Sequence, residues 1–210
     1  MYLVRPFEPA RDMDGARKAF QGGFHHILWP IIEHADGMVD DIILTFHRMG
    51  ARSYVAEAEG EARGILVGGL LFEPGPLLRA AGLAAGLGWR WLAGARRGDA
   101  QPFARACFRR VILGYAPFEY LHPMTRSTET LLLTSQAEWR GGIGRVMMDA
   151  WIADSRRRGY RRSTVCTDSQ LAWDFYERYG FRRVREFDMS AYHYSLPGRD
   201  VTGYIYSLDL

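Results

Sequence analysis

The chain has 210 residues, 48% of them hydrophobic, and a net charge of +3, which fits one domain with a single well-buried core. No apolar run reaches the ~18 residues of a membrane span, and the N-terminal stretch MYLVRPFEPARD has no apolar core of a signal peptide. Cys107 and Cys166 are too few and too far apart for a disulfide framework or a zinc site, so a cytoplasmic protein with reduced thiols is expected.

Arginine supplies almost all of the positive charge. Lys18 is the sole lysine, so 26 of the 27 basic residues are arginine (27 − 1). The guanidinium group suits phosphate and carboxylate partners. Acidic residues are interspersed, however, and no DNA- or RNA-binding motif occurs. We therefore expect a solvated surface and no nucleic-acid partner.

The first quarter of the chain predicts a strand and three helical pieces, over residues 2–5, 12–20, 24–33 and 39–49. The pair Gly22-Gly23 is interpreted as a break between the first two helical pieces. Five candidate metal ligands lie here: His25, His26, Glu33, His34 and His47. Because neighbouring histidines point to different helix faces, surface or capping histidines are expected rather than a metal site.

Two strand patterns follow, over residues 53–58 and 64–71, and the glycine in their short connection, residues 59–63, predicts a hairpin. Residues 74–123 then carry two apolar, helix-like patterns. Interior Arg79 and Arg90 argue against a membrane span. Long insertions in compact domains are usually functional, so this segment is expected either to shape a pocket or to extend the core.

The most informative stretch is residues 130–159, which reads as strand, glycine loop and helix. Leu131-Leu132-Leu133 has the length of a buried strand, residues 136–139 are a polar break, and Gly159 is expected to end the helix. The apolar residues of the helix follow the spacing of one buried face: Ile143, Val146, Met147, Ala150 and Trp151.

The loop Arg140-Gly141-Gly142-Ile143-Gly144-Arg145 opens this helix. The first N–H groups of a helix have no partner within it and attract anions, and glycines let the backbone approach a phosphate closely. Arg140 and Arg145 could add charged contacts. The loop therefore suits a phosphate, although a simple connecting turn would have the same composition. It lacks the lysine of a Walker loop and the GxGxxG spacing of a dinucleotide site.

The last quarter predicts a buried strand over residues 161–167, with Asp168 or Ser169 capping the next helix. Gly180 is expected to end that helix. Two strands follow, over residues 181–189 and 203–210, and are expected to pair with each other.

Two motifs in this order resemble the acetyl-CoA-binding half of GNAT-family N-acetyltransferases. The first is the strand, TSQAEWRGGIG and helix, where the family carries an Arg/Gln-x-x-Gly-x-Gly/Ala loop for the CoA pyrophosphate. The second is FYERYGF, residues 175–181, which matches the family's Phe-Tyr-Glu-x-x-Gly-Phe pattern. The first motif departs by one residue, because Trp139 stands three before Gly142, where the family has Arg or Gln. A slightly shortened loop is therefore expected.

The resemblance implies a mixed α/β (α+β) fold, with a mostly antiparallel central sheet of six to seven strands flanked by helices. The whole chain, 1–210, would be one domain, with 74–123 as a helical insertion that shapes the acceptor pocket or only extends the core. It also implies acetyl-CoA as co-substrate, no metal, and direct acetyl transfer to an amine of a small molecule, peptide or protein. The last strand pair could support a homodimer. A catalytically inactive CoA-binding regulatory or interaction module is the alternative, and the presence of Tyr176 favours the enzyme.

The resemblance further implies which residues form the site. Tyr176 would give a proton to the CoA sulfur, while Glu129 is the first candidate for the general base and Glu57 the second. The strand before the loop would splay from the next one and offer backbone groups to the cofactor. The implied cofactor-binding residues are Leu133, Thr134, Ser135, Arg140, Gly141, Gly142, Ile143, Gly144, Arg145, Ser169, Ala172 and Tyr176.

Overall fold

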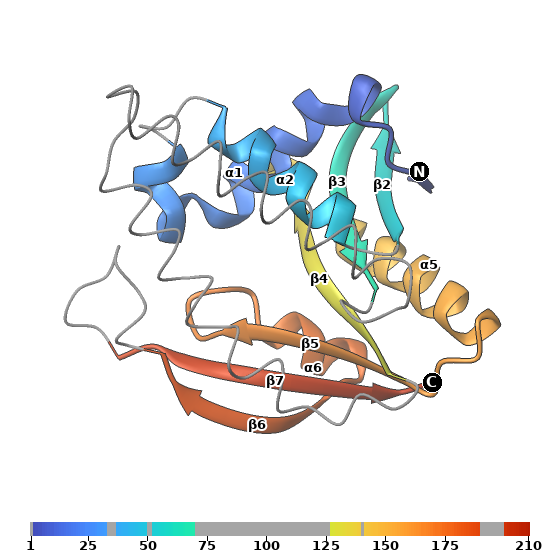
Figure 1. Cartoon of the computed structure of the whole chain (residues 1–210), viewed down its shortest axis with the longest axis vertical. Coiled ribbons are helices and arrows are strands. Elements are labelled where there is room, and N and C mark those ends of the chain that lie inside the picture. The colour runs from blue at the N-terminus through green and yellow to red at the C-terminus, as the bar shows by residue number, and fades with distance from the viewer. Residues whose placement is uncertain (1, 33–36, 50–51, 70–126, 140, 190–199) are drawn as a thin grey trace.

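The computed structural model describes residues 2–32, 37–49, 52–69, 127–139, 141–189 and 200–210. Within these ranges one seven-stranded sheet has the order β1-β2-β3-β4-β5-β7-β6, and four α-helices flank it (Figure 1). Every neighbouring strand pair is antiparallel except β4–β5. The predicted mostly antiparallel sheet of six to seven strands is confirmed. The expected insertion at 74–123 lies outside the described residues.

The elements follow the predicted order, except that the two predicted helical pieces 12–20 and 24–33 form one helix. They are β1 (Leu3–Pro6), α1 (Pro9–Ile32), α2 (Met38–Met49), β2 (Arg52–Ala58), β3 (Glu61–Gly68), β4 (Ser127–Ser135), the 3₁₀ turn η1 (Ala137–Trp139), α5 (Ile143–Arg157), β5 (Arg162–Asp168), α6 (Asp174–Tyr179), β6 (Arg182–Asp188) and β7 (Thr202–Asp209). No helix of the described part is long and apolar enough to cross a membrane.

Helix α1 runs without interruption through Gly22-Gly23, so the predicted break at these glycines is wrong. The glycines instead allow a close approach to the sheet. A Cβ on Gly23 would lie 2.1 Å from Thr134 Oγ1, and one on Gly15 would lie 2.2 Å from the Ala62 carbonyl oxygen. Residues 15, 22 and 23 follow the i, i+7, i+8 spacing of one helix face, which is the sequence signal of a contact stripe.

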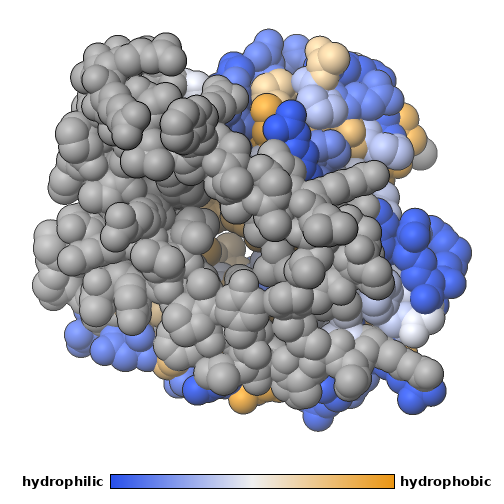
Figure 2. Space-filling model, viewed as in Figure 1, coloured by the Kyte–Doolittle hydropathy of each residue, from blue (hydrophilic) through white to orange (hydrophobic). Residues whose placement is uncertain are grey.

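The sheet separates two apolar clusters, because successive side chains of a strand point to opposite faces. On β3, Ile65 belongs to the cluster beneath α1 and α2, while Leu66 belongs to the cluster beneath α5. Trp151 is the largest fully buried side chain of the second cluster. On the face seen in Figure 2 the described surface is mainly hydrophilic, and Leu3 and Val184 are the large apolar side chains that the described part exposes.

The turn between β2 and β3 is shorter than the predicted five-residue connection. Its two residues, Glu59 and Gly60, have φ values of 55° and 78°, and positive φ at both central residues is the requirement of a type I′ hairpin turn. Strand β3 therefore begins at Glu61, three residues earlier than predicted.

Helix α5 is attached to β2 near its C-terminal end by Asp154. Its Oδ2 accepts hydrogen bonds from Arg52 Nη1 at 2.5 Å, Arg158 Nε at 2.9 Å and the Tyr54 hydroxyl at 3.0 Å. Burial raises the pKa of Asp154, but these hydrogen bonds outweigh burial and hold that pKa well below its usual range. The carboxylate thus remains ionised and joins helix to strand.

The segment after β5 corrects a second prediction, since neither Asp168 nor Ser169 caps α6, which begins at Asp174. Asp168 Oδ1 accepts a hydrogen bond from the Gln170 N–H at 2.7 Å, and Ser169 Oγ accepts one from the Thr202 N–H at 3.1 Å. These side chains hold the turn itself and attach it to β7.

Strand β7 lies between β5 and β6 and pairs with both. The predicted pairing of the last two strands is therefore confirmed, while the insertion of β7 beside β5 was not foreseen. Strand β6 forms one edge of the sheet. A homodimer through this last strand pair stays a prediction.

Candidate active site

Strands β4 and β5 share only part of their length. They pair in parallel from Ser127↔Arg162 to Thr130↔Val165, although β4 continues to Ser135 and β5 to Asp168. Figure 1 shows the two strands meeting near the C-terminus and diverging from there. The expected splay is confirmed, and among the described residues it leaves one side of β4 without a strand partner over its last five residues.

The backbone of β4 determines which groups face this gap. The Gln136 N–H donates to the Arg63 carbonyl at 2.9 Å, toward β3. Successive residues direct their backbone groups to opposite sides of an antiparallel pair, so Leu133 and Ser135 direct theirs into the gap. The backbone groups of Thr134 instead face β3. Its side-chain hydroxyl donates to the Ala19 carbonyl of α1 at 2.7 Å. Two of the three predicted backbone residues are thus available to a ligand.

The glycine loop presents the open N-terminus of α5. Gly142, at φ 88°, precedes the helix, which has no capping side chain and no acidic residue in its first turn. A Cβ added at Gly141 or Gly142 would meet no described atom within 4 Å, so these two glycines face space that the described residues leave open. Its unpaired N–H groups and the positive end of the helix dipole can hold an anion.

The residues around this helix start differ in what they can contribute. Ile143 is fully buried, so only its backbone can contact a ligand, and a Cβ on Gly144 would lie 3.4 Å from the Phe175 ring. Arg145 is exposed, with its guanidinium 5.5 Å from the centre of the Tyr179 ring. Arg140 lies outside the described residues.

Trp139 stands at the motif position where Arg or Gln was expected, and its aromatic ring makes two contacts there. Its ring centre lies 6.2 Å from that of Tyr2 and 4.9 Å from the Arg63 guanidinium. The Tyr2 hydroxyl donates to the Gly141 carbonyl at 3.2 Å. Trp139 and Tyr2 therefore join the glycine loop to β1 and β3.

Gln136 supports the site in a way that the sequence analysis missed. It is 2% exposed, and its Nε2 donates to the carbonyls of Gly15 at 3.3 Å and Ala62 at 3.1 Å. Its Oε1 accepts from Arg63 Nη1 at 3.3 Å. A polar residue directly after an apolar strand was the available signal, but its partners are distant in sequence.

Tyr176 lies on α6 within an aromatic cluster. Its ring stacks on that of Tyr206, with centres 5.9 Å apart, and meets Phe175 and Phe181 edge-on. No hydrogen bond of its hydroxyl is found among the described residues. Burial raises the pKa of Tyr176, and the charge of Cys166 raises it further. Tyr176 is therefore a protonated group packed between α6 and β7.

Residues 80–181 match the family model described as the acetyltransferase (GNAT) family. The chain belongs to this family.

Solved structures of several acetyltransferases resemble the whole chain. An N-acetyltransferase from Staphylococcus aureus Mu50 is 13% identical, with a TM-score of 0.59 over 100% of this chain and 98% of its own. A ribosomal-protein-alanine N-acetyltransferase from Brucella melitensis is 17% identical, with a TM-score of 0.59 over 99% of both chains. A Bacillus subtilis acetyltransferase in complex with CoA is 13% identical, with a TM-score of 0.53 over 100% and 99%. At these identities the likeness concerns the fold. No curated protein matches significantly.

The two candidate bases of the GNAT reaction have different surroundings. Glu129 is half-buried and pairs in register with Thr164 at the closed end of the gap. Glu57 Oε2 accepts hydrogen bonds from Arg5 Nε at 2.6 Å and Arg11 Nη2 at 2.7 Å. These two arginines occupy the Glu57 carboxylate, and the role of Glu129 as general base stays a prediction.

The remaining predicted cofactor contacts lie before α6. The Ser169 side chain holds β7, as described above, and Ala172 is exposed. The structure thus places α6, which carries Tyr176, next to the start of α5, because a Cβ on Gly144 would meet the Phe175 ring. Ser169, in contrast, has a structural partner.

Histidine and acidic side chains form no metal site in the described ranges, which contain no group of three or more His, Cys, Asp or Glu able to hold an ion. Nδ1 of His47 lies 2.9 Å from Ser53 Oγ. Burial, followed by the charge of Arg48, lowers the pKa of His47, so it is neutral at neutral pH. His26, Glu33 and His34 are not among the side chains that the structure describes.

Proposed function

We propose that this GNAT protein transfers an acetyl group directly from acetyl-CoA to an amine of a small molecule, peptide or protein. The observation that carries the proposal is the gap between β4 and β5, which opens beyond Thr130↔Val165. In the part of the chain that the structure describes, a strand edge without backbone partners lies beside the uncapped start of α5. An extended chain ending in a pyrophosphate, as in CoA, has the shape and charge for both features.

The cofactor would be bound by several moderate contacts. The N–H groups of Gly142, Ile143 and Gly144 would receive the pyrophosphate, with Arg145 nearby. A helix dipole contributes about 0.3–1 kcal/mol to an exposed charge, whereas a Kd of about 1 μM corresponds to about 8 kcal/mol. The pantetheine arm must therefore add hydrogen bonds to the backbone of Leu133 and Ser135, in the manner of an added strand.

The proposed reaction uses groups on both sides of the gap. A backbone N–H of β4 polarises the thioester carbonyl, and the neutral amine attacks the carbonyl carbon. The C–S bond breaks, and the CoA sulfur leaves with a proton from Tyr176. The attacking nitrogen loses a proton to Glu129, directly or through water. The raised pKa of Tyr176 keeps this group protonated at neutral pH, as a proton donor requires.

The first test is calorimetric titration with acetyl-CoA and with CoA. Micromolar binding is expected for the wild type and for Ala153→Glu, a control that adds the same charge at an exposed position of α5. Gly142→Glu and Gly144→Glu should abolish binding, because a carboxylate would occupy the anion site. Absence of binding in the folded wild-type protein would contradict the proposed cofactor site.

The second test separates an enzyme from a CoA-binding module. Thiol release from acetyl-CoA is measured with a panel of primary amines, and turnover is expected with at least one. Tyr176→Phe should lower kcat roughly tenfold to a thousandfold and leave CoA affinity nearly unchanged. Tight binding without thiol release from any amine would favour the regulatory or interaction module instead.

A further inference from the structure

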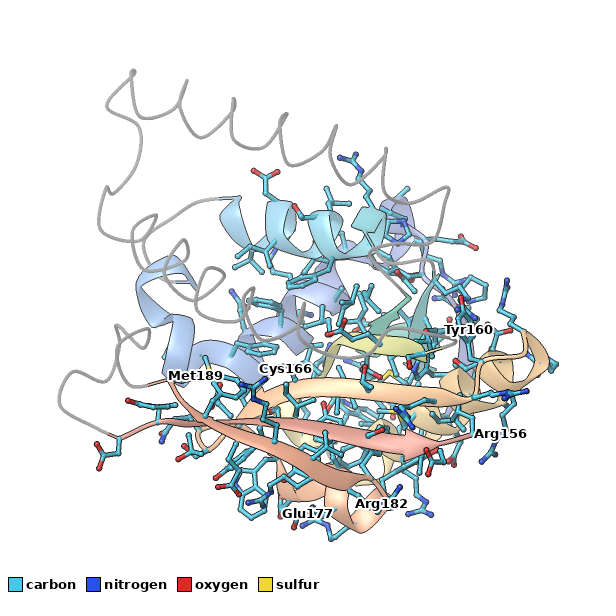
Figure 3. All side chains as sticks on the ribbon, turned by 60° about the horizontal axis from the view of Figure 1, so that its bottom comes forward. Arg156, Tyr160, Cys166, Glu177, Arg182 and Met189 are labelled. Atoms are coloured by element: carbon cyan, nitrogen blue, oxygen red, sulfur yellow. The ribbon has the colours of Figure 1, made fainter. Side chains whose placement is uncertain are left out.

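Three side chains from three elements form a closed network around α6. Glu177 Oε1 accepts hydrogen bonds from Arg183 Nη2 at 2.6 Å and from the Tyr206 hydroxyl at 2.9 Å. Arg183 Nε donates to the same hydroxyl at 3.1 Å. These residues belong to α6, β6 and β7, and Figure 3 shows Glu177 on the side of β7 opposite Cys166. We call this set the Arg183 triangle.

Further contacts hold Arg183 in one orientation. Its guanidinium lies 4.3 Å from the centre of the Tyr204 ring and 5.0 Å from that of Trp173. Its Nη1 donates to Glu186 Oε1 at 2.7 Å. A planar guanidinium with five donors can satisfy all these contacts at once, which an ammonium group cannot.

Two members of the Arg183 triangle are in direct contact with Tyr176. Glu177 is the next residue along α6, and Tyr206, which is fully buried, stacks on the Tyr176 ring with centres 5.9 Å apart and planes at 29°. Helix α6 has only six residues, and so short a helix has little stability of its own. The orientation of Tyr176 therefore depends on what holds α6 against β6 and β7.

We propose that Arg183 is a positioning residue for the proton donor. By holding Glu177 and Tyr206 together, it fixes the Tyr176 ring so that its hydroxyl faces the gap. This inference rests on the proposed function, because it assigns Arg183 a part in the same reaction. In this role Arg183 acts through Glu177 and Tyr206, and it is assigned no contact with cofactor or acceptor.

The expected effects differ between stability and rate. Arg183 and Glu177 are 28% and 43% exposed, and ion pairs at such exposure contribute little to folding. A displacement of about 1 Å in a catalytic group, in contrast, can lower a rate about a hundredfold. Loss of Arg183 should therefore reduce kcat more clearly than it reduces stability or cofactor affinity.

The test is a double-mutant cycle between Arg183→Met and Tyr176→Phe, measured as thiol release from acetyl-CoA with the best primary amine of the screen. Arg183→Met alone should lower kcat about tenfold, with KM for acetyl-CoA within about twofold of the wild type. Because its effect passes through the Tyr176 hydroxyl, the same change in a Tyr176→Phe background should alter kcat less than twofold.

Two further variants control for general damage. Arg182→Met removes the neighbouring ion pair with Asp209, in which the residues are 76% and 63% exposed, and should leave kcat unchanged. Arg183→Lys keeps the charge and should give an intermediate kcat. If Arg183→Met fails to fold, the Lys variant and its combination with Tyr176→Phe serve for the cycle.

The outcomes separate the two proposals. An unchanged kcat in Arg183→Met, or losses that multiply in the double variant, would overturn the positioning role and leave the acetyltransferase intact. An unchanged kcat in Tyr176→Phe would reject Tyr176 as the proton donor, and with it the positioning role of Arg183. If the wild type releases no thiol with any amine, the proposed function fails and the positioning role fails with it.

Discussion

The close packing of α1 on β3 makes Gly15→Ala a sensitive test of the architecture behind the site. A Cβ at residue 15 would lie 2.2 Å from the Ala62 carbonyl oxygen, whereas real Cβ contacts stay above 3.0 Å. The helix would have to move by at least 0.8 Å (3.0 − 2.2), because a backbone oxygen cannot rotate away. That movement also draws the Gly15 carbonyl from Gln136 Nε2, which donates to it at 3.3 Å.

The sign of the effect follows from two opposing magnitudes. Alanine in place of glycine favours a helix interior by about 1 kcal/mol, whereas overpacking a tight contact costs about 1–3 kcal/mol. The weakened hydrogen bond of buried Gln136 adds about 1 kcal/mol to that cost. We therefore expect Gly15→Ala to lower the free energy of unfolding by about 1–3 kcal/mol.

Urea denaturation without CoA measures this effect. Gly144→Ala is the matched control for stability, because its Cβ would lie 3.4 Å from the Phe175 ring, an ordinary contact, and should leave stability unchanged or raise it slightly. Since Gln136 also precedes the glycine loop, Gly15→Ala should weaken acetyl-CoA binding as well. A Gly15→Ala protein as stable as the wild type would refute the close approach of α1 to β3.

Two further predictions concern α5. Gly142→Ala should destabilise the protein by about 1–2 kcal/mol, because φ is 88° there, whereas Gly141→Ala should change stability little in urea denaturation. The pKa of Asp154 is raised by burial but held well below its usual range by hydrogen bonds, Arg52 first. Its stabilisation is therefore present above about pH 4 and lost as the pH falls toward the folded-state pKa. Asp154→Asn should be less stable at pH 7 and lose less stability on acidification; an unchanged acid transition would contradict this assignment.

Local conformation was predictable from the sequence where one residue type decides it. Gly159 and Gly180 were expected to end their helices, and both have positive φ, at 80° and 116°. Gly142 likewise has the positive φ that the loop permitted. Glycine alone adopts this region without strain, so position in the chain and residue type were sufficient.

The structural role of the glycines in α1 could not be predicted from residue type alone. Gly22-Gly23 has the composition of a break, and only the neighbouring strand shows that the pair makes a contact. A Cβ on Gly22 would lie 3.2 Å from the Ser135 carbonyl oxygen. Glycine weakens a helix by about 1 kcal/mol, and the packing of α1 over the sheet outweighs that cost.

The sequence by itself determined the family, through a glycine loop and a FYERYGF segment whose spacing is local. It also determined that successive side chains of β3 point to opposite faces of the sheet, which places Ile65 and Leu66 in opposite clusters. Tertiary structure decided which groups meet at the gap, because β5 leaves β4 after Val165 and takes β7 as its other neighbour. The pairing of β5 with β4 and β7 and the contacts of Tyr206 with Glu177 and Arg183 join residues far apart in the chain, and no local pattern encodes such partners.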